Sequence, residues 1–445
     1  MRDNDPDAKT EAERNKSNAN AKQLSTRFFF HNRWANRMKQ RRIIIICDQA
    51  SKVGGHARVA IESAAGLASN GEEVFFFASH GPIDAELTQA NVNVILTGQP
   101  DALDERNRLY GACRGLWNSR AKKQLSQLLE DRTSRKSIIH IHGWTKSLSP
   151  SVLSEIISAR APIICTIHEF FVCPNGEFFN FRSRSICNLV PMSQKCILSD
   201  CDSRSYYHKM WRIARQAITQ QLAKFPSSVT NYIYTTELAK RIISKYLPGD
   251  ANYYYLPNPV YITKMPQVAA WQNRPAIYIG RLAIEKGVLP AAEILGRLNV
   301  PFEIAGSGEL SGQVHTANPN AVLHDWLSSE ELVCLLARAR VLIFPSLWYE
   351  TFGLVVYEAL ACGVPVIATR ESAAAEAIID NCNGRLFSWD KAGDFENAML
   401  SAADSVTVER WSKFAYSNYW ERPLTIDLHV AGLKDIYERV CRHAA

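Results

Sequence analysis

The stretch VLIFPSLWYETFGLVVYEALACGVPVIAT, residues 341–369, predicts a strand, a helix and a second strand in succession. Val341–Pro345 is a short apolar run that ends in a proline, which indicates a buried strand. Gly353–Cys362 has the apolar spacing of a helix, and Gly363 stands where a glycine commonly ends one. Val364–Thr369 is a second apolar run. Parallel strands joined by a helix build α/β domains, so we expect an α/β fold.

The loop between the first strand and the helix is the expected ligand site. Open α/β sheets bind ligands beyond the carboxyl ends of their strands. Thr351 stands where a helix N-cap would stand. The unpaired N–H groups and the partial positive charge at a helix start suit a diphosphate. The candidate diphosphate-binding residues are Thr351, Phe352, Gly353 and Leu354.

Two carboxylates flank this helix start, Glu350 in the loop and Glu358 inside the helix. Carboxylates repel phosphate but accept hydrogen bonds from hydroxyl groups, so a sugar on one side and a ribose on the other would suit them. The pattern therefore favours a sugar nucleotide as the ligand. For Glu358 alone, the alternative is a residue that caps or decorates a surface helix.

The same stretch closely resembles the signature of retaining glycosyltransferases of family 4, which have the GT-B fold. The matching residues are Pro345-Ser346, Glu350-Thr351-Phe352-Gly353, Glu358-Ala359 and Ala361-Cys362-Gly363-Val364-Pro365-Val366-Ile367-Ala368. The resemblance implies that Glu350 binds the hydroxyl groups of the donor sugar and that Glu358 binds the nucleotide ribose. It also implies two facing Rossmann-like domains with a cleft between them.

A chain of 445 residues is too long for one ordinary hydrophobic core, which predicts two domains. The proline-marked turn Leu256–Val260 indicates a boundary. The predicted organisation is a disordered basic leader 1–41, an N-terminal acceptor-side Rossmann-like domain 42–258 with a Cys/Arg-rich insert 170–215, a linker 259–274, a C-terminal donor-binding Rossmann-like domain 275–425 and a helix 426–445 that crosses back.

The net charge of +7 is concentrated at the start of the chain. Residues 1–42 contain eleven Lys or Arg and five Asp or Glu, and Phe28–Arg42 mixes aromatic with basic residues. Residues 27–42 are therefore a candidate contact with an anionic membrane surface. The alternative is a basic leader whose aromatic residues pack on the domain. The rest of the chain is nearly neutral, which argues against nucleic-acid binding.

The cysteine content and the apolar runs indicate the compartment. Eleven cysteines, several of them in apolar runs, favour reduced thiols over a secreted disulfide framework. The sequence shows no signal-peptide pattern and no apolar run of the ~18 residues needed to span a bilayer. We expect a cytoplasmic protein, with residues 27–42 as its means of peripheral attachment to the inner face of the cell membrane.

Near the start of the first domain, Gly54-Gly55 follow a predicted strand and precede an amphipathic helix. This opening is of the Rossmann type, although no G-x-G-x-x-G is present. It resembles the glycine loop of the same family, which faces the donor phosphates and the acceptor. His142 and His168 each end a predicted parallel strand, where a polar residue at the base of a loop is the plain alternative. His168 matches the active-site histidine of the family, whereas the roles of His142 and His56 stay open.

The insert 170–215 contains four cysteines, Cys173, Cys187, Cys196 and Cys201, with no C-x-x-C pair. Four thiolates can close a structural zinc site, and free thiols packed in a loop are the alternative. The insert also carries basic residues among aromatic ones, including Arg204 and Arg212. The family places acceptors on this domain, which leads to the hypothesis that the insert covers an anionic or lipid-linked acceptor.

The second domain opens with a predicted strand, followed by Arg281 and, five residues later, Lys286. A guanidinium fork and an ammonium at this spacing can bracket a diphosphate, and the family resemblance implies that role. Surface charges are the alternative for an isolated pair. The resemblance also places Val322–Leu327 against the nucleotide base, with Leu327 as a binding residue. Asp325 stands there in place of the family's glycine.

The expected activity is glycosyl transfer with retention from a nucleoside diphosphate sugar to a glycan or lipid-linked acceptor, in cell-surface polysaccharide or glycolipid biosynthesis. His168 and Glu350 are the expected catalytic residues, and no Asp-x-Asp stands at a convincing strand end, so no metal or other cofactor is expected to be required. Three alternatives remain: a GT-B epimerase of sugar nucleotides, a glycoside phosphorylase, and a non-catalytic protein that binds sugar nucleotides or glycans.

Overall fold

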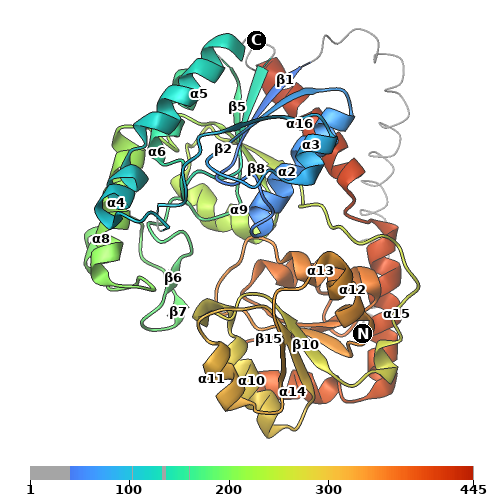
Figure 1. The fold of residues 1–445 in the computed structure, drawn as a ribbon. Helices are drawn as coiled ribbons and strands as arrows, with labels where there is room; N and C mark the ends of the chain where they lie inside the picture. Colours follow the sequence, from blue (N-terminus) through green and yellow to red (C-terminus); the bar gives the residue numbers. More distant parts are fainter. Residues whose placement is uncertain (1–40, 103, 133–136, 160, 444–445) are drawn as a thin grey trace, which may run out of the picture. The chain divides into compact units, whose positions relative to one another are not determined.

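The computed structural model describes residues 41–102, 104–132, 137–159 and 161–443. The predicted leader 1–41 and the predicted membrane contact 27–42 lie outside the described residues, apart from their last one or two positions. The described chain contains two large parallel sheets with helices around them (Figure 1). The predicted α/β class is therefore confirmed.

The first sheet has seven parallel strands in the order β3-β2-β1-β4-β5-β8-β9. Its inner strands are runs of Ile, Val and Phe without alternation, because both faces of a parallel sheet are covered by helices. The strands are β1 (Arg42–Ile46), β2 (Glu73–Ala78), β3 (Asn93–Leu96), β4 (Ser137–Ile141), β5 (Ile163–Thr166), β8 (Asn231–Tyr234) and β9 (Asn252–Tyr255). The helices are α2 (Gly55–Ser69), α3 (Ala85–Gln89), α4 (Arg108–Leu116), α5 (Ser119–Arg132), α6 (Pro150–Ser158), α7 (Gln194–Leu198), α8 (Tyr206–Gln221) and α9 (Glu237–Ile243).

The second sheet has six parallel strands in the order β12-β11-β10-β13-β14-β15. The strands are β10 (Ala276–Ile279), β11 (Phe302–Ala305), β12 (Val322–His324), β13 (Val341–Phe344), β14 (Val366–Thr369) and β15 (Gly384–Phe387). The helices are α10 (Val288–Arg297), α11 (Ser311–Ala317), α12 (Ser329–Ala337), α13 (Leu354–Cys362), α14 (Asp394–Ser401) and α15 (Ser405–Glu421). The strand-helix-strand unit predicted from residues 341–369 is β13, α13 and β14, at the centre of this domain.

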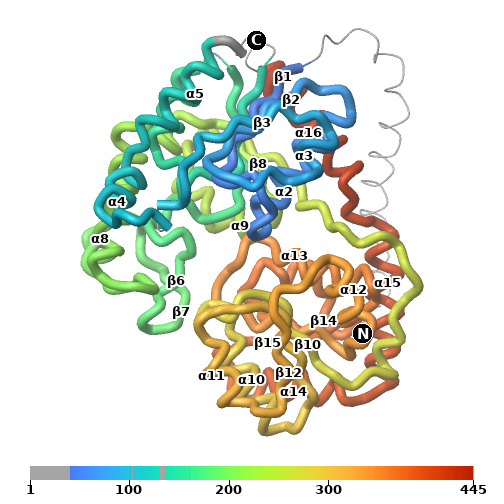
Figure 2. Tube along the Cα trace, viewed as in Figure 1, coloured from blue at the N-terminus to red at the C-terminus, as the bar shows by residue number. Residues whose placement is uncertain are grey.

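The insert after β5 forms a small subdomain of its own. It contains a short antiparallel hairpin, β6 (Phe179–Asn180) and β7 (Ser185–Ile186), followed by α7 and α8. Figure 2 shows the hairpin as a loop that projects from the first domain next to the start of α8. The insert therefore adds a wall beside the carboxyl ends of β4 and β5.

The last helix, α16 (Ile426–His443), packs on the first domain although it follows the second in sequence. Its buried residues Val430, Leu433 and Tyr437 belong to the apolar cluster that contains β1 and α2. Gly66 of α2 permits this close approach, because a Cβ atom there would lie 2.6 Å from the Val430 side chain. The chain therefore passes twice between the two domains.

Candidate active site

An ion pair lies at the loop that follows β13. The Nζ atom of Lys286 lies 2.6 Å from Oε1 of Glu350, and the Ser346 hydroxyl donates to the same oxygen at 3.0 Å. The side chains of Lys286 and Glu350 are only 19% and 11% exposed, and Nζ also lies 5.0 Å from the centroid of the Trp348 ring. The structure thus joins the predicted phosphate-binding lysine directly to the predicted sugar-binding glutamate.

The backbone of Glu350 adopts a left-handed conformation with φ of 53°. Residues with a Cβ atom rarely adopt this conformation, because it costs on the order of 1–3 kcal/mol and persists only where the surroundings enforce it. Here the bonds from Lys286 and Ser346 hold the side chain in place. Such strained residues are concentrated at functional sites, which agrees with a role for Glu350 in the reaction.

The predicted N-cap of α13 is wrong. The helix starts at Leu354, and the residue before it is Gly353, with φ of 88° and no side-chain hydrogen bond to the first turn. The first amides of α13 therefore lack a capping side chain, which leaves them suited to an anion. Phe352, 3% exposed, stacks on Tyr357 of the helix with ring centroids 4.5 Å apart. Gly55 lies against this start, because its Cβ position would be 3.5 Å from Leu354.

Thr351 connects the second domain to the first instead of capping the helix. Its hydroxyl donates to the carbonyl oxygen of His168 at 3.0 Å. Its own carbonyl oxygen accepts hydrogen bonds from the hydroxyls of Thr235 and Thr236, at 2.9 and 3.0 Å. The loop that carries Glu350 is therefore hydrogen-bonded to two segments of the first domain, and one of these segments contains the predicted catalytic residue His168.

Three histidines form a hydrogen-bonded row at the carboxyl ends of β4 and β5. Nε2 of His168 lies 2.9 Å from Nδ1 of His142, whose Nε2 lies 3.2 Å from Nδ1 of His140. Burial, together with the neighbouring histidines, lowers the pKa of His168 and of His142 well below the usual value, so both rings are neutral at neutral pH. His56 also lies nearby, with its ring centroid 6.5 Å from that of His168. Both histidines whose roles the sequence left open thus lie beside His168.

Glu358 is buried, with 6% of its surface exposed, so the alternative of a surface glutamate is wrong. Its Oε1 accepts a hydrogen bond of 3.3 Å from Nη1 of Arg58. Burial raises the pKa of Glu358, and the charge of Arg58 opposes that rise. Sequence reasoning missed Arg58, although it lies one helical turn after Gly54 at the expected donor-binding loop. The arginine approaches Glu358 from the first domain.

The remaining predicted donor residues are more dispersed. The side chain of Arg281 is 58% exposed and pairs with Glu285 at 2.8 Å. It therefore has a different carboxylate partner from Lys286, which pairs with Glu350. Leu327 is half-buried against the core of the second domain, beyond the end of β12. Among the described residues, no hydrogen bond or ring contact joins Leu327 to the Lys286–Glu350 pair.

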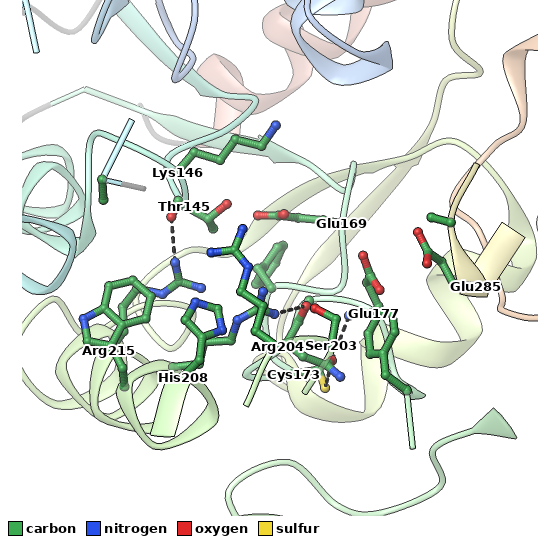
Figure 3. A pocket seen from close by; sticks show the side chains of 18 of the residues that line it. Thr145, Lys146, Glu169, Cys173, Glu177, Ser203, Arg204, His208, Arg215 and Glu285 are labelled. Atoms are coloured by element: carbon green, nitrogen blue, oxygen red, sulfur yellow. Dashed lines mark hydrogen bonds between the residues drawn. The ribbon is translucent and has the colours of Figure 1, made fainter. Parts of the chain in front are cut away.

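A cavity of about 580 Å³ lies next to these residues. Its walls come from both domains: Thr145 and Glu169 from the ends of the first sheet, Arg204 from the insert, and Arg281 with Glu285 from the second domain (Figure 3). Glu169 is the residue after His168. His168 and Glu350 themselves are not among the residues that line the cavity.

The structure does not support the zinc site considered for the insert. Cys173, Cys196 and Cys201 are buried, and all eleven cysteines of the chain are free. Within the described parts of the chain, no three or more His, Cys, Asp or Glu side chains are grouped so that they could hold a metal ion. None of the described helices combines the length and the apolar character required to cross a membrane.

Comparisons with known proteins agree with this arrangement. The family model described as "Glycosyltransferase Family 4" matches residues 53–264, and that described as "Glycosyl transferases group 1" matches residues 274–405. The chain is 26% identical to a glycogen synthase of Mycobacterium tuberculosis over 361 residues, which cover 75% of this chain and 78% of the relative. It is 32% identical to a GDP-mannose-dependent alpha-mannosyltransferase of Corynebacterium glutamicum over 144 residues, which cover 32% of this chain and 34% of that one.

Solved structures of low sequence identity share the fold. A sucrose-phosphate synthase of Thermosynechococcus elongatus has a TM-score of 0.65 at 16% identity, covering 91% of this chain and 100% of the other. HepE of Anabaena, solved in complex with UDP-glucose, has a TM-score of 0.60 at 17% identity, with the same coverage. The two parallel α/β domains thus have the GT-B fold, as predicted. The chain belongs to the group 1, family 4 glycosyltransferases, and it is an enzyme of that type.

Proposed function

We propose that the protein transfers a sugar, with retention of anomeric configuration, from a nucleoside diphosphate sugar to a hydroxyl group of a glycan or lipid-linked acceptor. The observation that carries this proposal is the buried Lys286–Glu350 pair, 2.6 Å apart, in the domain whose helix α13 has no side-chain cap. A cation and uncapped amides suit a diphosphate, and a neighbouring carboxylate suits sugar hydroxyls. The relatives named above, a glycogen synthase and a mannosyltransferase, support the reaction class.

The donor residues divide between the two ends of the nucleotide sugar. Lys286, Arg281 and the first amides of α13 bind the diphosphate, and they stabilise the negative charge that grows on it as the glycosidic bond breaks. Glu350 holds hydroxyl groups of the sugar. Glu358 holds those of the ribose, which replace Arg58 as its hydrogen-bond partner. The donor complex of HepE with UDP-glucose supports a nucleoside diphosphate sugar as the donor class.

In the proposed step the bond between C1 and the diphosphate oxygen breaks, and a bond from the acceptor oxygen to C1 forms on the same face of the sugar. The acceptor proton passes to the departing phosphate oxygen, so no carboxylate nucleophile is required. Neutral His168 borders this face and donates or accepts hydrogen bonds without adding a charge. The reaction is proposed to need no divalent cation.

A panel of nucleoside diphosphate sugars tests the donor assignment by thermal shift, followed by product analysis with and without EDTA. The variants Lys286→Ala and Glu358→Ala should abolish the ligand-induced shift and the turnover. Lys413→Ala is the matched control, because that lysine is exposed and pairs with Glu409 on the surface of α15, with the Trp271 ring 5.8 Å away. Wild-type turnover in Lys286→Ala, or no shift of the wild type with any donor, contradicts the proposal.

The alternatives give different products in the same assay. An epimerase converts its sugar nucleotide with no acceptor present, and a phosphorylase shows the absorbance of a lysine-bound pyridoxal phosphate. A non-catalytic binding protein shows the thermal shift with neither hydrolysis nor transfer. The anomeric configuration of the product, read from proton coupling constants, tests retention.

A further inference from the structure

We propose that the cavity between the insert and the second domain binds an acceptor that carries an anionic group, a carboxylate or a phosphate, at a basic end formed by Arg204, Lys146 and Arg215. This inference rests on the transfer reaction proposed above and names the class of its acceptor. The cavity volume of about 580 Å³ lies within the roughly 300–1,000 Å³ of small-molecule sites. It is thus large enough for a substituted sugar.

The first argument is that the side chains of two cations at this end have no hydrogen-bond or ion-pair partner among the described residues. The side chains of Arg204 and Lys146 both line the cavity and are exposed, and neither forms a hydrogen bond or an ion pair with another described residue. Figure 3 shows them at the side of the cavity where Arg215 and His208 also lie. Unpaired cations that line one cavity are suited to charge-assisted hydrogen bonds with an anion.

The second argument concerns which charges of this end are already compensated within the protein. Nη1 of Arg215 donates to the Thr145 carbonyl at 2.7 Å, and burial together with the neighbouring Arg212 lowers the pKa of Arg215 to about 10. Arg212 is compensated by Asp202, whose Oδ2 lies 3.2 Å away. The carboxylates whose charges act on Arg215 are Glu169 and Asp48. Asp101 also lines the cavity near Lys146. Among the described residues no ion pair joins these carboxylates to Arg204 or Lys146, so both cations remain available to an anionic ligand.

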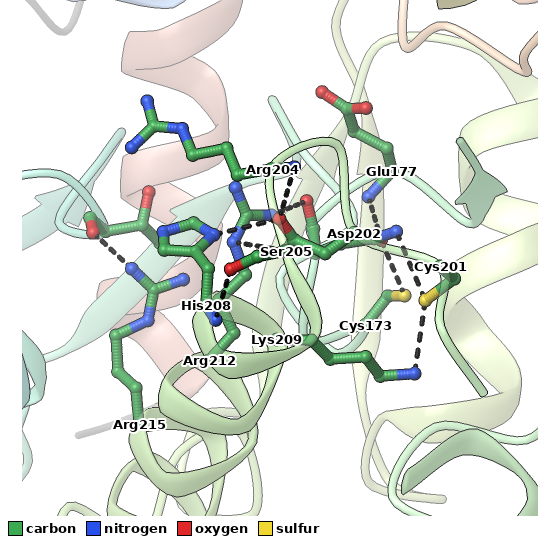
Figure 4. A network of polar contacts seen from close by, with 12 residues as sticks. Cys173, Glu177, Cys201, Asp202, Arg204, Ser205, His208, Lys209, Arg212 and Arg215 are labelled. Carbon is green, nitrogen blue, oxygen red and sulfur yellow. Dashed lines mark hydrogen bonds and ion pairs between the residues drawn. The ribbon is translucent and has the colours of Figure 1, made fainter. Parts of the chain in front are cut away.

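The third argument is that the basic residues are held in place before any ligand binds. Asp202 is fully buried and accepts hydrogen bonds from the backbone N–H of Arg204 at 2.9 Å and, on the same oxygen, from Nδ1 of His208 at 2.9 Å (Figure 4). Lys209, also buried, donates to Ser199 Oγ at 2.7 Å. This network fixes the loop that presents Arg204, and a preorganised site loses less entropy on binding.

The opposite end of the cavity is acidic and lies toward the donor residues. Oε2 of Glu177 is buried without a hydrogen-bond partner among the described residues. Burial and the neighbouring Glu285 raise the pKa of Glu177 to about 7, although Arg281, Lys286 and Arg212 oppose the rise. A buried carboxyl group without a partner is costly, and acceptor hydroxyls would satisfy it. The acceptor would thus place its anionic group on the insert and its hydroxyls near the donor sugar.

Binding without turnover tests this inference. Isothermal titration in the presence of saturating UDP compares methyl glucoside, glucuronic acid and glucose 6-phosphate. We expect the charged probes to bind at least ~10-fold more tightly than the neutral one, since one charge-assisted hydrogen bond is worth about that factor or more. The more tightly bound charged probe identifies a carboxylate or a phosphate. Added NaCl should weaken the charged probes alone.

Two variants and one control assign the effect to the basic end. Arg204→Gln and Lys146→Gln should each weaken the charged probes roughly 10-fold and leave the UDP-induced thermal shift unchanged. Arg184→Gln is the control, because Arg184 is an exposed arginine of the same insert that does not line the cavity. Equal affinities for all probes, no binding of any probe, or equal effects of Arg184→Gln and Arg204→Gln would overturn the inference. Loss of UDP binding in the wild type would instead refute the proposed transfer reaction.

Discussion

The Lys286–Glu350 pair predicts a loss of stability that can be measured separately from catalysis. The variant Lys286→Met removes the cation but keeps an unbranched apolar chain near Trp348. Glu350, 8% exposed, then keeps only the Ser346 hydroxyl as a side-chain hydrogen-bond partner among the described residues. A buried carboxylate that loses its cation destabilises the folded state.

The size of the loss follows from the burial of the pair. Breaking a buried ion pair by removing one partner costs about 3–5 kcal/mol, and the remaining exposure and the Ser346 bond place this case at the lower end, about 3 kcal/mol. For a domain of about 150 residues this corresponds to a decrease in Tm of roughly 6–12 °C. Glu350→Gln keeps Lys286 over the Trp348 ring and should cost less, about 1–2 kcal/mol.

The double variant distinguishes pairing from two independent losses. Because Lys286→Met/Glu350→Gln leaves neither charge unpaired, its cost should fall below the sum of the single variants by about 2 kcal/mol. Urea unfolding and calorimetry of all three variants measure this coupling. Lys413→Met is the control, since its surface pair with Glu409 should contribute less than about 1 kcal/mol. Additive losses, or a Lys286→Met shift no larger than that of the control, would refute the reasoning.

Three further predictions follow from other contacts. Thr351→Val removes the hydroxyl bond to the His168 carbonyl, so steady-state kinetics should show a donor KM several-fold higher while calorimetry shows Tm within about 3 °C. The raised pKa of Glu177 means that its protonated form stabilises the fold fully below pH 4.5, and that this stability is lost as pH rises through about 7. The free energy of unfolding of Glu177→Gln in urea, compared with that of the wild type, should therefore be higher at pH 8 than at pH 5. Gly363→Ala should lower the free energy of unfolding by about 1–2 kcal/mol, since φ is 81° there and the new Cβ would lie 2.8 Å from Gln267.

Local sequence patterns were sufficient to predict the central unit of the second domain. The predicted strand Val341–Pro345 is β13, Val341–Phe344, and the predicted helix Gly353–Cys362 is α13, Leu354–Cys362. Continuous apolar runs and a left-handed Gly363 determine these limits through interactions within a few residues. Such signals do not depend on the rest of the fold, so a single sequence reveals them.

Contacts between distant residues could not be predicted in this way. Thr351 fits the composition of an N-cap, but its hydroxyl bonds to a carbonyl 183 residues away. Arg58 contacts Glu358 across 300 residues, and no spacing in the sequence signals that pair. The strand-end histidines are an intermediate case. Their position at one edge of the sheet was predictable, but the contact of His142 with His168 depends on β4 and β5 being neighbours.

The insert shows a different limit. Its cysteines suggest metal ligands, yet Asp202 organises this segment. Asp202 accepts hydrogen bonds from His208 and from the backbone of Arg204, and it forms an ion pair with Arg212. A single aspartate has no distinctive spacing, so the sequence did not reveal it. The sequence marks the basic residues of the insert as candidates for acceptor binding, but only the structure separates those that line the cavity from others such as Arg184.

The position of Thr351 next to Glu350 determines how variants of the active site should be designed. The Glu350 backbone has φ of 53°, and the residue after it bonds to the His168 carbonyl and to Thr235. If Glu350 becomes alanine, the bonds that enforce this backbone conformation disappear, and the position of Thr351 and its contact with His168 change as well. Glutamine keeps the length of the side chain and the bond from Ser346. A comparison of Glu350→Gln with Glu350→Ala therefore separates the binding of sugar hydroxyls from the positioning of the first domain's histidine.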